Sequence, residues 1–265
     1  MSDRSKSEGL VLYERDGKIA HIRLNRPDKL NAFTDDSVIA LRETWERFDD
    51  DDEAWVAIVS GSGRAFSTGA DVYQRQLKPR EELERLGGPD GAVRAGKLSD
   101  ARNSKPVIAA VHGYAMGMAL GLVLECDLAV VTEDAVLQIT EVPRGLWGHY
   151  AWQALQFRGS MVFADEVVLT GRRFTGREAA DHGVVTRAVS PGGHIAAAEE
   201  LANQILMNPP LAVRASIRGR RWYIEEAQRF QVMLRASMPL HLTEDFRESA
   251  LAFVENREHR PYLGR

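Results

Sequence analysis

Two segments of this chain follow the same plan. In each, a short apolar run passes through a glycine-rich turn and opens what the pattern predicts to be a helix: GSGRAFSTGAD at 61–71 and KPVIAAVHGYAMGMALGLVLECD at 105–127. The first amides of a helix have no acceptor inside it, so two such turns can direct backbone N–H groups at one point. That arrangement stabilises a developing oxyanion without side-chain chemistry. The two segments therefore indicate an enzyme that polarises a carbonyl group.

Predicted strands and helices alternate around these segments. Apolar residues on either side of Asp16-Gly17 predict a hairpin of strands at 10–13 and 19–24. Helical spacing of apolar residues predicts a helix over 35–48, with Thr34 or Asp35 as its cap. Further strands are predicted at 55–60, 106–111, 128–131 and 136–139, and another helix at 116–125. This alternation is typical of an α/β architecture with parallel sheets.

Two stretches depart from this alternation. Residues 74–96 are polar, contain several glycines and predict a mobile connection that shapes a pocket. From residue 195 the pattern turns helical, with blocks at 195–207, 211–223, 224–238 and 244–256. We expect this helical tail to cap its own core or to pack on a neighbouring subunit.

Composition excludes several classes of function. The 265 residues are 44% hydrophobic and 27% charged, which fits one globular domain or a core with an appendage. The net charge is −4 and the longest charge run, 49–53, is acidic, so we expect no nucleic-acid partner. The polar N-terminus, the lack of a membrane-length apolar stretch and a single cysteine, Cys126, predict a cytoplasmic protein without membrane contact.

Cofactor motifs are missing as well. GSGRAF at 61–66 has a partial glycine pattern, without the Lys-Ser/Thr pair that completes a P-loop. The seven histidines are scattered, and no cluster has metal-ligand spacing. We expect neither a bound metal nor a nucleotide cofactor.

A set of short motifs runs in order along nearly the whole chain. It comprises Asn25-Arg26-Pro27, Asn31-Ala32, Gly61-Ser62-Gly63, AFSTGAD at 65–71, the stretch 105–118, Leu169-Thr170-Gly171, AADHGVV at 179–185 and FVENR at 253–257. On this ordered set the chain resembles the crotonase superfamily, also called the enoyl-CoA hydratase/isomerase family. The resemblance implies an α/β spiral of ββα units over 1–195, a C-terminal helical oligomerisation region over 196–265, and homotrimers that often pair into hexamers.

The resemblance also implies an acyl-CoA thioester substrate, with CoA as part of the substrate and no separate cofactor. Two backbone amides of the family hold the thioester oxygen, and the matching positions here are Ala70 and Met118. The family usually has glycine where Met118 stands. Every residue except proline keeps the N–H, so the donor survives, while the methionine side chain is expected to narrow the pocket.

Family hydratases carry two glutamates around one water, and this chain matches only one of them. The first position is occupied by Gly121, whereas the second is Glu141 in ITEVPRGLWG, which is our candidate acid/base residue. One carboxylate can take a proton from C2 of an acyl-CoA and return it at C4, which is isomerisation. Adding water normally uses two groups, so the pattern favours an isomerase or an atypical hydratase.

Two residues are candidates to replace the missing carboxylate. His149 in GLWGHYAW stands where the family has a glycine-rich turn beside the catalytic water, and a histidine there can act as acid or base. Glu125 lies four residues after Gly121 on the same helix face, although a buried ion pair with an arginine is the favoured role for it.

For CoA, the resemblance points to six residues on the two early motifs. They are Arg26, Lys29, Leu30, Ser67, Gly69 and Asp71, of which the two basic residues are candidates to meet phosphates. Acyl-CoA hydrolysis, cleavage of a carbon–carbon bond, and acyl-CoA binding without turnover stay open beside isomerisation and hydration, because one fold hosts many reactions.

Overall fold

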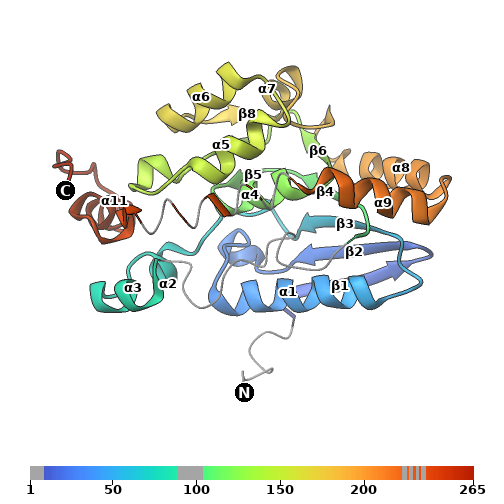
Figure 1. Cartoon of the computed structure of the whole chain (residues 1–265), viewed down its shortest axis with the longest axis horizontal. Coiled ribbons are helices and arrows are strands. Elements are labelled where there is room, and N and C mark those ends of the chain that lie inside the picture. The colour runs from blue at the N-terminus through green and yellow to red at the C-terminus, as the bar shows by residue number, and fades with distance from the viewer. Residues whose placement is uncertain (1–8, 89–103, 223–225, 227–228, 231–232, 234–236) are drawn as a thin grey trace.

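In the computed structural model of this chain, residues 9–88, 104–222, 226, 229–230, 233 and 237–265 are described, except for the side chains of His149 and Tyr150. Most strands form one large sheet with the order β1-β2-β3-β4-β6-β9 (Figure 1). β1 and β2 are an antiparallel hairpin, and every other neighbouring pair is parallel. The strands are β1 Val11–Asp16, β2 Ile19–Leu24, β3 Val56–Gly61, β4 Val107–Val111, β6 Leu128–Thr132 and β9 Arg187–Val189.

A second sheet of three short strands lies beside the first. It contains β5 Tyr114–Met116, β7 Val136–Gln138 and β8 Phe174–Thr175, in the order β5-β7-β8. The chain passes from β4 in the large sheet to β5 in the small sheet and then into α4 Met118–Glu125. It then passes in the same way from β6 in the large sheet to β7 in the small sheet. This succession of two strands and a helix is the ββα spiral that the resemblance implied.

Both faces of the large sheet are covered, because residues of a strand alternate between its two sides. In β3, Ala57 and Val59 belong to the main core with α1 Asp35–Asp50 and α4, whereas Val56 and Ile58 belong to a second core under α8 His194–Leu206. This explains why β3 and β4 read as continuous apolar runs rather than as alternating patterns. Thr34 caps α1 in a capping box with Ser37.

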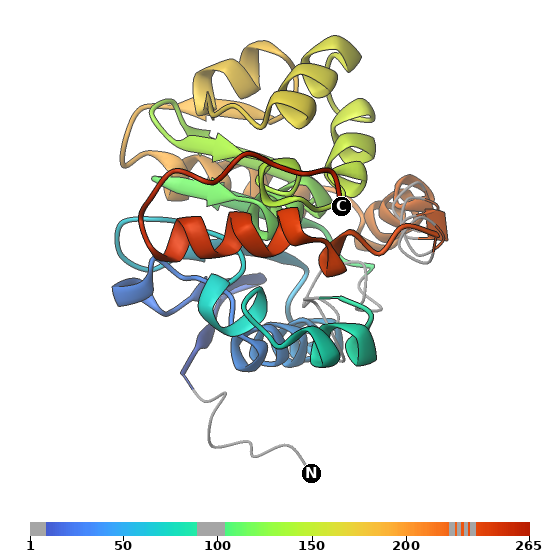
Figure 2. The same ribbon diagram turned by 90° about the vertical axis from the view of Figure 1, so that its left-hand side faces the viewer.

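The remaining helices surround these sheets. α11 Glu244–Val254 lies against the short helices η4 Val142–Arg144 and η5 Leu240–Leu242 and against α2 Val72–Arg75 (Figure 2). The bounds are η2 Pro27–Lys29, α2 Val72–Arg75, α3 Arg80–Leu86, η4 Val142–Arg144, α5 His149–Gln156, α6 Met161–Thr170, α7 Gly176–Asp181, α9 Pro210–Arg220, η5 Leu240–Leu242 and α11 Glu244–Val254.

Most predicted elements are confirmed within one to three residues, and the departures concern short helices and short strands. α2 and α3 occupy much of the polar stretch that was predicted to be a connection, while 89–103 lies outside the described residues. The helices α5, α6 and α7 and the strands β5, β8 and β9 were not predicted. Most of the predicted block 224–238 also lies outside the described residues, and the division at residue 195 stays a prediction. No described helix is long and apolar enough to cross a bilayer.

Candidate active site

The two glycine-rich segments lie directly against each other. A parallel bridge pairs Ser67 with Ala115. Within it the Ser67 amide donates to the carbonyl of Tyr114 (2.9 Å), and the Met116 amide donates to the carbonyl of Ser67 (3.2 Å). The end of the first segment is therefore fixed against the strand that leads into α4.

Two glycines allow this approach. Gly69 has a φ of 84° and Gly117 a φ of 50°, a region that residues with a Cβ rarely adopt. A Cβ on Gly69 would overlap a main-chain carbonyl and would lie 3.4 Å from the amide nitrogen of Met118. A Cβ on Gly117 would overlap the hydroxyl of Thr140. Ala70, which follows Gly69, therefore comes close to the first residue of α4.

The amides of Ala70 and Met118 have no acceptor among the described residues. Met118 is the first residue of α4, so its N–H has no acceptor within the helix. On both sides of Ala70 the main chain is engaged, because the Phe33 amide donates to the carbonyl of Gly69 (2.8 Å) and the Asp71 amide donates to the carbonyl of Phe33 (2.9 Å). The main chain around Ala70 is thus held, while its own N–H makes no hydrogen bond to a described residue.

Both residues line a cavity of about 970 Å³. Its wall is formed by the end of η2 and the loop after it, the start of α4, the segment from β7 to α5, and residues of α2, η5 and α11. Glu141 and Gly121 are part of the same wall. The three principal residues predicted from the sequence, Ala70, Met118 and Glu141, are therefore brought together in one cavity.

Glu141 follows β7 and precedes η4, where the turn fixes its backbone. Its carbonyl accepts hydrogen bonds from the amides of Arg144 (3.0 Å) and Leu146 (2.8 Å). Its Oε1 lies 3.7 Å from the position that a Cβ on Gly117 would take. The half-buried carboxylate therefore faces the start of α4, where the amide of Met118 begins the helix. A proton acceptor and backbone donors thus meet in one place, and this arrangement can stabilise an anion while moving a proton.

Gly121 occupies the position of the missing first glutamate, and Glu125 and His149 were the candidates to replace that glutamate. Gly121 lies one turn into α4, where its amide donates to the carbonyl of Gly117 (2.9 Å). Glu125 is buried, with 1% of its surface exposed, and is not among the residues that line the cavity. Its pairing with an arginine stays a prediction. His149 is the first residue of α5, but its side chain lies outside the described part of the structure.

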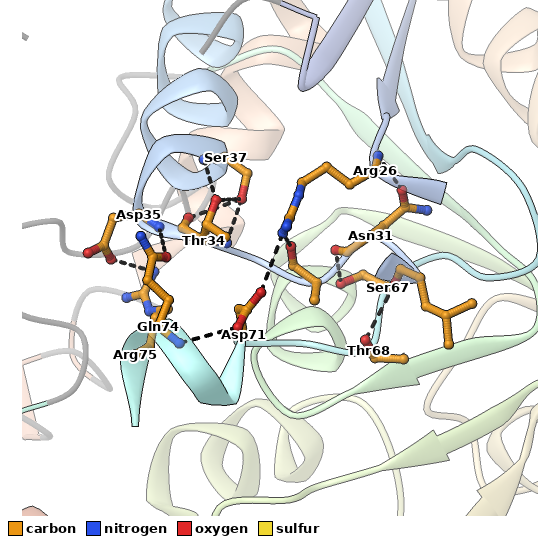
Figure 3. Close-up of polar contacts among 12 residues, drawn as sticks. Arg26, Asn31, Thr34, Asp35, Ser37, Ser67, Thr68, Asp71, Gln74 and Arg75 are labelled. Carbon is orange, nitrogen blue, oxygen red and sulfur yellow. Dashed lines mark hydrogen bonds and ion pairs between the residues drawn. The ribbon is translucent and has the colours of Figure 1, made fainter. Parts of the chain in front are cut away.

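The six predicted CoA residues divide into two groups. Lys29, Leu30 and Asp71 line the cavity. Arg26, Ser67 and Gly69 are not among the residues that line it, and Figure 3 shows Arg26 and Ser67 in polar contacts with other parts of the protein. The Ser67 hydroxyl, which is fully buried, donates to the carbonyl of Asn31 (2.8 Å) and accepts from the amide of Gly69 (3.1 Å).

An ion pair supports the segment that carries Ala70. The Arg26 guanidinium donates to the carbonyl of Ala32 and lies 3.7 Å from the Asp71 carboxylate (Figure 3). Asp71 in turn caps α2, because its Oδ1 accepts from the amide of Gln74 (3.3 Å). Arg26 is thus engaged with the protein.

Two residues of this region were missed as contributors to the site. Asn31 has a φ of 55°, and its side chain donates to the carbonyls of Ser62 (2.9 Å) and Ala65 (2.8 Å). Asparagine tolerates the left-handed region, so an asparagine in a turn was the available signal. Arg75 lines the cavity with a fully buried side chain and pairs with Asp35 at 3.4 Å. Nothing in the polar stretch 74–96 marked Arg75 as a buried residue of the site.

Within the described residues, no three histidine, cysteine or carboxylate side chains are grouped so that they could hold a metal ion. The ββα spiral thus places a carboxylate and two backbone amides that lack a described acceptor in one cavity, a set of groups that suits the binding of an anion.

Comparison with known proteins identifies the family. The model of the enoyl-CoA hydratase/isomerase family matches residues 14–261. A short-chain-enoyl-CoA hydratase of Clostridium acetobutylicum is 29% identical over 94% of this chain and 95% of its own, and a carnitinyl-CoA dehydratase of Salmonella arizonae is 35% identical over 95% and 97%. The crystal structure of an enoyl-CoA hydratase/isomerase from Mycobacterium paratuberculosis superposes with a TM-score of 0.80, at 31% identity over 92% of this chain and 98% of that one.

The chain belongs to the enoyl-CoA hydratase/isomerase family, the crotonase superfamily. It is an enzyme of the enoyl-CoA hydratase/isomerase type, as the sequence predicted.

Proposed function

We propose that this protein isomerises an enoyl-CoA ester, with the amides of Ala70 and Met118 holding the thioester oxygen and Glu141 moving the proton. The observation that carries the proposal is the position of the Glu141 carboxylate, whose Oε1 faces the start of α4 beside Gly117. Of the predicted CoA residues, Lys29, Leu30 and Asp71 stand in the same cavity, which suits a bound thioester.

The proton balance of this reaction needs only one carboxylate. Glu141 takes a proton from C2 of a 3-enoyl-CoA, and the electron pair moves onto the thioester oxygen as a dienolate. The same carboxyl group then returns the proton at C4, so that the double bond moves from C3=C4 to C2=C3. Two amide donors lower the energy of the anion, and losing one such donor typically costs about 2–4 kcal/mol of barrier. No cofactor besides the CoA of the substrate takes part.

Hydration is the second candidate, and the names of the relatives favour it. A short-chain-enoyl-CoA hydratase and a carnitinyl-CoA dehydratase match nearly the whole chain. Water addition needs a second acid or base, and α4 has Gly121 at the position expected for it. His149 at the start of α5 is our candidate for that group. His149→Ala should then abolish hydration of crotonyl-CoA and leave isomerisation of a 3-enoyl-CoA intact.

Glu141→Gln is the decisive variant. We expect isomerisation of trans-3-hexenoyl-CoA to fall at least about 100-fold, because removing a general base typically costs two to four orders of magnitude. Calorimetry with hexanoyl-CoA should show unchanged binding, since the amide keeps the size of the side chain. Glu200→Gln, at an exposed position on α8, is the matched control and should keep full activity.

The outcomes separate the alternatives. Hexenoyl-CoA turnover that survives Glu141→Gln would end the proposed role of this carboxylate. Binding of acyl-CoA by the unmodified protein without turnover of any ester would indicate a binding protein, and release of free CoA would indicate a hydrolase.

We also propose that the protein assembles as a homotrimer or homohexamer. Large apolar side chains that are mostly exposed in the single chain support this, among them Val162 and Leu169 on α6 and Leu211 on α9.

A further inference from the structure

Gly121 differs from the other glycines around the cavity. It is buried inside α4, yet a Cβ added there would meet no described atom within 4 Å apart from its chain neighbours and the backbone of its own helix. At Gly69 and Gly117 an added Cβ would overlap neighbouring atoms, and both have positive φ values. Packing and backbone conformation thus explain those two glycines but give no reason for a glycine at 121.

Stability argues against glycine at this position. In a helix interior glycine is about 1 kcal/mol less favourable than alanine. An alanine at 121 would therefore stabilise α4 without a clash against any described atom. What glycine provides instead is space, and the space opens into the cavity that Gly121 lines.

The surroundings define what the space can hold. Met118 lies one turn before Gly121 in α4, and Leu146, Trp147 and Ala151 line the same cavity from the η4–α5 side. The indole N–H of Trp147 is engaged, because it donates to the carbonyl of Met238 (3.0 Å). These side chains offer hydrocarbon surface within the cavity, which suits an apolar group.

The space is also close to the reacting atoms. Gly121 is hydrogen-bonded to Gly117, and the Glu141 carboxylate faces Gly117. An acyl group held between Glu141 and the amide of Met118 would carry its C2–C4 atoms past the open side of α4. A substituent on those carbons, rather than the far end of a long chain, would enter the space.

We propose that the space beside Gly121 is a subsite for an apolar substituent near the reacting carbons, and that the substrate is a branched or ring-bearing enoyl-CoA rather than a straight-chain one. This inference rests on the proposed function, since it takes the acyl group to lie between Glu141 and the start of α4.

Gly121→Ala tests the subsite with two matched esters. (Cyclohex-1-enyl)acetyl-CoA carries a ring at the reacting carbons, and trans-3-hexenoyl-CoA does not. We expect the unmodified enzyme to prefer the ring ester, and Gly121→Ala to lower kcat/KM for it at least about 10-fold, because one methylene in an apolar pocket typically changes discrimination 10–200-fold. The value for hexenoyl-CoA should change less than about 3-fold, and Gly121→Leu should widen the difference.

Gly219→Ala is the matched control for the helix. Gly219 lies in α9, is exposed, and also has no neighbour within 4 Å of an added Cβ. Both alanine variants should raise the free energy of unfolding by up to about 1 kcal/mol. Only Gly121→Ala should change the ratio of kcat/KM for the two esters. An unchanged ratio in Gly121→Ala would overturn the subsite.

Binding of unreactive esters separates this inference from the proposed function. Cyclohexylacetyl-CoA and hexanoyl-CoA can be compared by calorimetry without any turnover. If Gly121→Ala weakens binding of the cyclohexyl ester alone while neither enoyl ester reacts, the subsite stands and the isomerase function fails. The opposite result is that both enoyl esters react, and that Gly121→Ala lowers neither the affinity for cyclohexylacetyl-CoA nor the turnover of (cyclohex-1-enyl)acetyl-CoA. In that case the proposed isomerase function is supported and the subsite is ruled out.

Discussion

At the scale of single residues, Asn31 holds the loop that supports Ala70. Its side chain donates to the carbonyls of Ser62 and Ala65, accepts from the amide of Arg26 (2.8 Å), and is almost fully buried. Asn31→Ala would leave these groups without partners and would place alanine at a φ of 55°. We expect the free energy of unfolding to fall by about 3 kcal/mol, measured by urea denaturation, because each buried group left unsatisfied costs about 1–3 kcal/mol.

Asn25→Ala is the matched control for that measurement. The Asn25 side chain also donates to a main-chain carbonyl, that of Gly9 (2.9 Å), but at an exposed position. Its loss should cost less than about 1 kcal/mol, since water replaces the partner. Equal losses in the two variants would show that Asn31 is an ordinary turn residue.

At the scale of elements, the start of α4 allows an amide to be removed without removing the helix. Proline lacks the N–H but is well tolerated at the first helical position, which Met118 occupies. We therefore expect Met118→Pro to fold and to lose about 30–1,000-fold in kcat for the isomerisation, which corresponds to the loss of one oxyanion donor.

Met118→Ala is the companion variant, because it truncates the side chain and keeps the amide. Its kcat should stay within about 3-fold of the unmodified enzyme. Similar losses in Met118→Pro and Met118→Ala would assign the effect to the side chain and would remove this amide from the mechanism. Circular dichroism of both proteins checks that α4 still forms.

The elements that the sequence predicted are those with strong local signals. The apolar period of α1 with its Thr34 cap, the Asp16-Gly17 hairpin and the continuous apolar runs of β3 and β4 are all confirmed. α2 and α3 have only four and seven residues, too few for an apolar period to emerge, so their polar composition suggested a connection. Their positions depend on tertiary contacts, such as those of α3 with η5.

At the scale of the whole molecule, the candidate site combines segments that only the fold brings together. The motifs around Ala70, Met118 and Glu141 could be located from the sequence, because glycine turns and a family pattern mark them. The position of the Glu141 carboxylate near Gly117, at the start of α4, could not be predicted, because it joins two units of the spiral. The open space at Gly121 was equally hidden, because the sequence showed a missing carboxylate and the structure shows what replaces it.

Stability toward acid depends on how α8 covers the large sheet. α8 packs on β3, β4 and β6, and its first residue, His194, stacks on the ring of His112 at 4.6 Å. Burial, and then the nearby His112, lower the pKa of His194 from 6.5 to about 4. The unfolded chain therefore binds a proton at this residue between pH 6.5 and pH 4 that the folded chain does not.

The contribution of His194 to the free energy of unfolding should consequently be fully present above about pH 6.5. It should decline as the pH falls toward 4. We expect His194→Gln to flatten the dependence of the free energy of unfolding on pH in that window, measured by urea denaturation at pH 4.5, 5.5 and 7. The exposed His259 is the matched control, and His259→Gln should keep the original slope. A slope that persists unchanged in His194→Gln would place the acid sensitivity elsewhere. A reduced dependence on pH in His194→Gln would show that the packing of α8 on the large sheet is favoured by a neutral His194 imidazole.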